Sequence, residues 1–325
     1  MNNRRRVLVG LGIGALAAPF YSWGQQPPKV YRLGILGAST RNASSVKAFL
    51  EALRTLGYIE GQNLSVIARF ADGHHESLPA LARELVAENV DIIFAATTNT
   101  VIAAMQATSA IPIVFSLVSD PVGSGFVQSL NRPGGRVTGA TGMNRELSAK
   151  RVEVLRDAFP KISRIAVLSS DEPQAPAMLA ETQKAAKHFG MQIQITEVRS
   201  RDDFERASKQ IRNWRSDAIY VIDGSRNGTI RPLLAEFAAQ LKLPAIYADG
   251  RYADDGGLIT YGMNYVDLSR RAAHHVDKIF KGANPADLPV EQPTRFEMVI
   301  NLKTAKALGI KIPSSMLVRA DRVIQ

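Results

Sequence analysis

Residues 91–115, DIIFAATTNTVIAAMQATSAIPIVF, decide the fold. The run Asp91–Ala95 is short and apolar and predicts a buried strand, and Pro112–Phe115 predicts the next strand. Between them, Thr98–Ala107 predicts a helix. A strand, a helix and a second strand in succession form a βαβ unit, in which the two strands lie parallel in one sheet.

The same alternation extends from residue 30 to the end of the chain. Before residue 142 we expect strands at 31–37, 64–70 and 137–141, and helices at 43–56, 76–88 and 122–130. The cycle then repeats with helices at 146–159, 176–189, 202–214, 230–241, 266–280 and 302–308, and strands at 165–169, 192–198, 218–222, 245–247, 258–261 and 297–300. Two such series, each with about five strands, predict an α/β protein made of two doubly wound, parallel-sheet lobes.

The first 24 residues predict an export signal. Arg4–Arg6 is cationic, and the apolar run at 7–18 is too short to span a bilayer. Ser22-Trp23-Gly24 offers a cleavage site before Gln25, so we expect a periplasmic protein cut near Gly24/Gln25. The order polar-Arg-Arg-x-apolar-apolar at 3–8 also fits a twin-arginine signal, and an ordinary Sec signal remains the alternative.

Composition excludes several kinds of protein. The 325 residues contain no cysteine, which excludes disulfides, a lipid anchor on cysteine and thiolate catalysis. The formal charge of +10 is spread along the chain instead of clustered, so we expect no nucleic-acid partner. No apolar run after the signal reaches 18 residues, so we expect the mature protein to be soluble.

The sequence also lacks the motifs of catalysis and of cofactor binding. There is no Gly-x-Ser-x-Gly elbow and no P-loop, and the glycines at 10, 12 and 14 precede any strand. The histidines fall as His74-His75, His188 and His274-His275, and neighbours on a helix point about 100° apart. We therefore expect no metal and no cofactor, read His274 and His275 as helix-surface residues, and favour a binding protein over an enzyme.

Polar residues follow the predicted strands. In doubly wound sheets, ligands bind beyond the carboxyl ends of the strands, and a helix N-terminus there suits an anionic group. Ser, Thr, Asn and Asp are also the usual helix N-caps, which is the alternative interpretation of each one. The candidate ligand-binding residues are Ser39, Thr40, Thr97, Thr98, Asn99, Ser116, Ser119, Asp120, Asn144, Asp171, Asp223, Ser225, Asp249 and Tyr252.

Longer motifs resemble a known family. They are LNRPGG at 130–135 followed by VTG at 137–139, PADLPV at 285–290, VINLKTA at 299–305 and EGQN at 60–63. The chain resembles the substrate-binding proteins of ABC transporters with the periplasmic binding protein type I fold, in the group that includes TrpX-like tryptophan/tyrosine-binding proteins. The resemblance implies an N-terminal lobe of residues 27–142 plus 263–290, a C-terminal lobe of residues 143–262 plus 291–325, and a hinge of three chain crossings.

The resemblance also implies a function. A monomer of this kind captures one small molecule, such as an amino acid or a related carboxylate, and delivers it to an ABC permease in the inner membrane. Thr98 matches a threonine in a ligand loop of the family, but Ala96–Asn99, Ser170–Pro173 and Asp249–Tyr252 depart from the usual patterns, so the ligand need not be an aromatic amino acid. A periplasmic enzyme and a ligand-sensing domain on the same scaffold remain alternatives.

Overall fold

The structure is a computed structural model that describes residues 29–41 and 43–325. Residues 31–325 form one compact unit. The predicted signal at 1–24 and its cleavage site lie outside the described residues. Within the described ranges, every helix is too short or too polar to cross a membrane.

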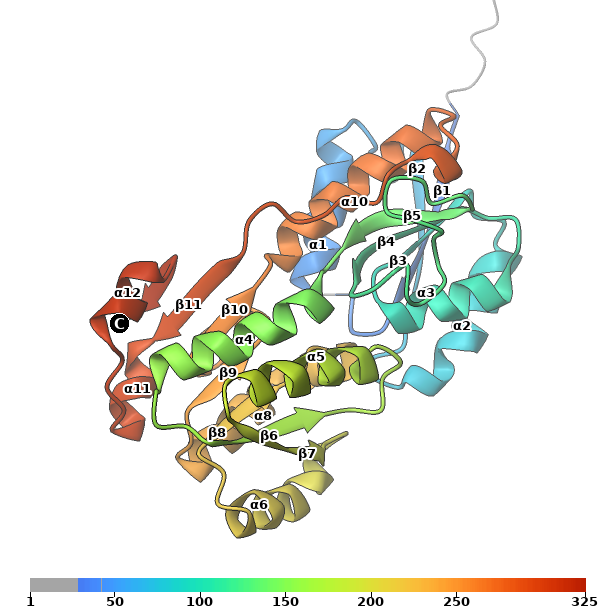
Figure 1. Cartoon of the computed structure of the whole chain (residues 1–325). Coiled ribbons are helices and arrows are strands. Elements are labelled where there is room, and N and C mark those ends of the chain that lie inside the picture. Colours follow the sequence, from blue (N-terminus) through green and yellow to red (C-terminus); the bar gives the residue numbers. More distant parts are fainter. Residues whose placement is uncertain (1–28, 42) are drawn as a thin grey trace, which may run out of the picture. The chain divides into compact units, whose positions relative to one another are not determined.

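The first lobe is built on a sheet of five parallel strands (Figure 1). The strand order is β2-β1-β3-β4-β5, so β2 lies on one side of β1 and the later strands follow on the other side. The strands are β1 (Tyr31–Gly37), β2 (Leu64–Phe70), β3 (Ile92–Ala95), β4 (Ile113–Val118) and β5 (Val137–Thr141).

Helices cover both faces of this sheet, as doubly wound topology requires. On one face, α1 (Ser44–Thr55) packs against α10 (Tyr265–Phe280), and the rings of Phe49 and Phe94 stack with centroids 3.8 Å apart. On the other face, α2 (Leu78–Ala87) packs against α3 (Thr98–Ala107) above a core that includes Leu85 and Phe115. Because α10 comes late in the sequence, the first lobe contains two separate stretches of the chain.

The second lobe is built on a seven-stranded sheet of order β12-β11-β10-β9-β8-β6-β7. Five of its six strand pairs are parallel, and the sixth, between β10 and β11, is antiparallel. The expectation of about five strands was therefore too low for this lobe. The strands are β6 (Arg164–Ser169), β7 (Gln192–Glu197), β8 (Ala218–Val221), β9 (Ala245–Tyr247), β10 (Ile259–Gly262), β11 (Glu297–Asn301) and β12 (Arg322–Ile324).

Helices also cover both faces of the second sheet. One apolar cluster joins α4 (Asn144–Ala158) and α5 (Ala175–His188) to the sheet through residues such as Leu155 and Met178. The opposite cluster joins α6 (Phe204–Asn213) and α8 (Arg231–Leu241) to it, through residues such as Ile211 and Phe237. The remaining helices of this lobe are α7 (Ser225–Thr229), α9 (Arg251–Asp254), α11 (Leu302–Leu308) and α12 (Ser314–Arg319).

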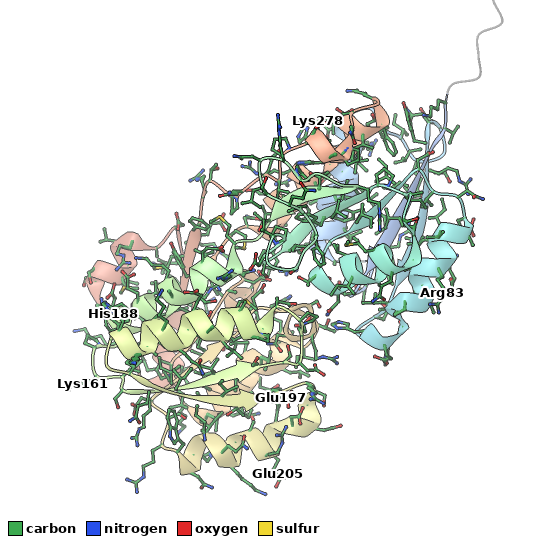
Figure 2. The ribbon with its side chains drawn as sticks, turned by 45° about the vertical axis from the view of Figure 1, so that its right-hand side comes forward. Arg83, Lys161, His188, Glu197, Glu205 and Lys278 are labelled. Carbon is green, nitrogen blue, oxygen red and sulfur yellow. The ribbon has the colours of Figure 1, made fainter. Side chains whose placement is uncertain are left out.

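Two local predictions were wrong. Residues 122–130 form turns instead of a helix, because the Asp120 carboxylate accepts a hydrogen bond from the Gly123 N–H at 2.8 Å and Gly125 has a φ of 71°. His275 is not on a helix surface but is 1% exposed, with its Nε2 3.0 Å from the carbonyl oxygen of Pro289. The exposed charges lie elsewhere, for example at Arg83 and Glu205, which point outward from their helices (Figure 2).

The chain passes between the lobes at three places. The first follows β5 and includes Met143, whose φ of 49° is in the left-handed region. The second follows β10 at Gly262, where a Cβ atom would clash with the carbonyl oxygen of Ala248, so only glycine fits. The third is the extended segment before β11, in which the Glu291 N–H donates to the Gly139 carbonyl at 2.9 Å.

Candidate functional site

A central cavity of about 100 Å³ lies where strands of both sheets have their carboxyl ends. This is the position at which doubly wound sheets bind ligands. The residues that line it are Gly37, Ala38, Ser39, Ala43, Ser45, Val46, Ala96, Thr97, Thr98, Leu117, Ser119, Gln174, Asp223, Gly224, Ser225, Gly228, Asp249, Arg251, Tyr252 and Tyr265.

The first lobe contributes helix N-termini to the cavity. Thr97 is the N-cap of α3 and forms a reciprocal capping box with Thr100, whose hydroxyl accepts from the Thr97 N–H at 2.9 Å. Thr98, the first residue of α3, is 2% exposed, and Ser45 is the second residue of α1. The first N–H groups of a helix have no partner within the helix, so this wall offers donors to an anionic group.

The second lobe contributes a carboxylate, Asp223, just after β8. The Tyr265 hydroxyl donates to its Oδ1 and the Asn144 amide donates to its Oδ2, both at 2.5 Å. Part of Asp223 is accessible, and that part lines the cavity; protein surrounds the rest. This burial raises the pKa of Asp223 to about 6, against the bond from Tyr265 and the positive charge of Arg151, which lower it.

Asp249 and Arg251 form a second polar group in the wall. The Arg251 Nε donates to Asp249 Oδ2 at 2.7 Å, and the guanidinium lies 5.3 Å from the centre of the Tyr265 ring. Burial alone would lower the pKa of Arg251, but the charge and hydrogen bonds of Asp249 raise it above its ordinary value. These three residues also line an outer cavity of about 430 Å³ that includes Ser44, so they separate the two spaces.

A hydrogen bond joins the lobes beside the central cavity. Asn99 in α3 donates from Nδ2 to Oε1 of Glu172 in the second lobe at 3.1 Å. Glu172 is 3% exposed and also accepts from the Ser225 N–H at 3.0 Å and the Ser170 hydroxyl at 3.1 Å. A Cβ on Gly224 would clash with the Glu172 carboxylate, so glycine at 224 allows this close approach.

The structure brings most of the predicted ligand-binding residues to the central cavity. Those that line it are Ser39, Thr97, Thr98, Ser119, Asp223, Ser225, Asp249 and Tyr252. Asn99 and Asp171 line a neighbouring cavity of about 330 Å³ instead. The other four lie elsewhere: Asn144 behind Asp223, Asp120 in an ion pair with Arg145 at 2.8 Å, Ser116 buried in β4, and Thr40 exposed at the loop tip.

Sequence reasoning missed several residues of the cavity wall, above all Arg251, Tyr265, Gln174 and Ser45. Arg251 stands two residues after Asp249 in the loop after β9, and this spacing of opposite charges was a usable signal for an ion pair. Ser45 and Tyr265 are helix residues and Gln174 is the N-cap of α5, and their place in the wall depends on how the two lobes meet. No group of three or more His, Asp or Glu side chains within the described ranges is arranged to hold a metal ion.

Comparison with known proteins decides the family. The sequence model of the ABC transporter substrate binding protein family matches residues 39–324. The chain belongs to this family. As a member, this ABC transporter substrate-binding protein shares the two-lobed α/β fold of its solved relatives.

Individual relatives agree with this assignment. The chain is 27% identical over 267 residues to a tyrosine-binding protein of Clostridioides difficile (strain R20291), covering 82% of this chain and 76% of the relative. It is 25% identical, with a TM-score of 0.84, to a Streptococcus pneumoniae ABC domain in complex with L-Trp, covering 91% of this chain and all of the other. A conserved domain protein of Vibrio cholerae has 28% identity and a TM-score of 0.83 with the same coverage.

Proposed function

We propose that this substrate-binding protein captures a small amino acid, or a related carboxylate, in the central cavity and delivers it to an ABC permease in the inner membrane. The observation that carries the proposal is Asp223, a carboxylate that faces the cavity and already accepts one hydrogen bond on each oxygen. Asp249 is paired with Arg251, whereas none of the ion pairs among the described residues includes Asp223, so its carboxylate can accept a ligand ammonium group.

The opposite wall suits the other end of an amino acid. The N-termini of α1 and α3, with Ser45 and Thr98, form part of the cavity wall, and helix N-termini favour a carboxylate. Apolar residues such as Val46 and Leu117 remain for the side chain of the ligand. The cavity of about 100 Å³ is smaller than the ~300–1,000 Å³ typical of drug-sized ligands, which favours a compact amino acid.

Two measurements test this function. Mass spectrometry of the denatured, freshly purified protein identifies the compound it carried, and calorimetry on a panel of amino acids gives affinity and stoichiometry. We expect one site per chain, and a loss of about ten- to a hundredfold in affinity for Asp223→Asn, because a hydrogen bond to a charged group contributes roughly 1.5–3 kcal/mol. Asp202→Asn, an exposed carboxylate of the same lobe, is the matched control. Equal affinity in Asp223→Asn and wild type would exclude this orientation of the ligand.

The proposal extends to location and to the absence of turnover. We propose export of the chain by the signal at 1–24, with the twin-arginine route, and a monomeric mature protein in the periplasm. Cell fractionation followed by N-terminal sequencing should find a protein that begins near Gln25. The bound compound should be recovered unchanged after prolonged incubation, and steady conversion to a product would favour a periplasmic enzyme instead.

We also propose that the lobes, residues 27–142 with 263–290 and residues 143–262 with 291–325, close on the ligand about the three crossings. A ligand that contacts both walls binds the closed arrangement more tightly and so shifts the population toward it. The hydrogen bond between Asn99 and Glu172 supports this view, because it joins the two lobes beside the cavity and neither residue lines the cavity.

A further inference from the structure

Arg151, in the middle of α4, is fully buried and is the largest such side chain among the described residues. Arg151 takes part in none of the ion pairs found within 4 Å among the described residues. A buried guanidinium without a paired anion is unfavourable unless its donors are satisfied and its charge serves another group. The position of Arg151 therefore needs an explanation beyond packing.

The hydrogen bonds of Arg151 lead to the central cavity. Its Nε donates to the Tyr261 carbonyl at 2.8 Å, which fixes the guanidinium against β10. Its Nη2 donates to the side-chain oxygen of Asn144 at 2.6 Å, and the Asn144 amide nitrogen donates to Asp223 Oδ2 at 2.5 Å. Arg151, Asn144 and Asp223 thus form a directed chain of donors that ends at the carboxylate in the cavity wall.

The direction of this chain follows from chemistry. An arginine has donors and no acceptor, so the Asn144 side-chain oxygen must face it and the amide NH₂ must face Asp223. An NH₂ group can only donate, so it is satisfied at once by a carboxylate oxygen that accepts. Without Arg151 the Asn144 side-chain amide can rotate and turn its oxygen toward Asp223. That oxygen can only accept a hydrogen bond, so it would favour the protonated form of Asp223. A protonated Asp223 does not attract a ligand ammonium group.

We propose that Arg151 is a positioning residue that acts through the Asn144 amide to hold Asp223 ionised and oriented as the acceptor for the positive group of the ligand. The ligand's part in this proposal rests on the proposed function, whereas the effect of Arg151 on Asp223 does not depend on any ligand. Other groups also act on Asp223. Tyr265 donates to it, the negative charges of Asp249 and Glu172 oppose its ionisation, and Arg251 and Tyr252 lie within electrostatic reach.

The test is a carbon-13 NMR titration of the Asp223 carboxyl in full-length mature, ligand-free protein. In Arg151→Met the midpoint should rise by about one pH unit, which is about a tenfold loss of the ionised form below the midpoint. Arg151→Lys, which keeps a charge and a donor, should restore most of the shift. Lys150→Met removes the neighbouring, half-exposed charge of α4 and should leave the midpoint where it is in wild type.

A second variant covers the case in which Arg151→Met does not fold. Asn144→Ser keeps the arginine but breaks the relay, so the midpoint should again rise. An unchanged midpoint in folded Arg151→Met, or in Asn144→Ser if the former does not fold, would overturn the proposal. Calorimetry separates this result from the proposed function. If amino acids bind wild type but not Asp223→Asn, the proposed function is supported whatever the Arg151 variants do. If no amino acid binds wild type, the proposed function is refuted, and the titration still decides the role of Arg151.

Discussion

Replacement of Asp223 by asparagine should make the ligand-free protein more stable at neutral pH. In the folded state burial raises the pKa of this carboxyl from 3.8 to about 6, so the ionised form is disfavoured by folding. The unfolded chain then releases its proton at lower pH than the folded chain does. The free energy of unfolding contributed by Asp223 therefore falls as the pH rises from about 4 to about 6, and it is constant above that range.

The size of the effect follows from the same shift. A shift of one pKa unit corresponds to about 1.4 kcal/mol, so the full difference is about 3 kcal/mol as an upper limit. Water in the cavity screens the charge, and we expect about 1–3 kcal/mol. Asparagine has nearly the same shape, and the Tyr265 hydroxyl can accept from its NH₂ group as well as donate, so the two hydrogen bonds of the site can be kept.

Urea unfolding at several pH values measures this effect. The wild type, Asp223→Asn and the exposed control Asp202→Asn are refolded from denaturant to remove bound ligand and then compared from pH 4 to pH 7.5. The free energy of unfolding of Asp223→Asn should equal that of wild type near pH 4 and exceed it at pH 7.5. The other carboxyls titrate alike in both proteins, so their contributions cancel in the difference. A variant that is equally or less stable than wild type at pH 7.5 would refute the reasoning about burial.

Other changes should act on affinity and on closure. Thr98→Val should weaken binding of the amino acid about ten- to a hundredfold in calorimetry, and an unchanged affinity would remove α3 from the site. Asn99→Ala, which removes the bond to Glu172 between the lobes, should weaken binding about tenfold without touching the ligand, and no change would mean that this bond does not support closure. Arg251→Ala joins the central and outer cavities and should improve binding of tryptophan relative to alanine; a poorer relative affinity would refute the separating role of this side chain. Small-angle scattering should give a smaller radius of gyration with ligand than without it, and identical profiles would argue against closure.

The fold was predictable to the extent that each element carries its own signal. Strands such as Tyr31–Gly37 and helices such as Thr98–Ala107 have an apolar pattern that agrees with their packing, and their bounds were predicted correctly. β12 has three residues and lacks any such pattern. The turns at 122–130 were mistaken for a helix because apolar residues there have helical spacing, while the glycines at 123 and 125 and the carboxylate of Asp120 favour turns.

The candidate site was predictable only where it consists of loops after strands. Asp223 and Thr98 stand at such places, and topology alone brings them to one cavity. Tyr265 and Arg151 lie in helices, and nothing in their neighbours along the chain indicates that they act on Asp223. Their roles depend on which helix faces which strand end, and that is a property of the packed lobes.

Asn144 and Tyr265 each stand at the start of a helix directly after a crossing between the lobes, and each holds one oxygen of Asp223. This connection constrains how such a protein can evolve. A substitution at 223 that suits a new ligand also changes the bonds at two crossings, and thus the motion on which delivery depends. Thr97 pairs with Thr100 of its own helix, and neither Thr97 nor Thr98 has a side-chain hydrogen bond to a crossing among the described residues. We therefore expect gene duplicates of this protein to acquire new ligands through the first lobe, while residues 144, 223 and 265 change together or not at all.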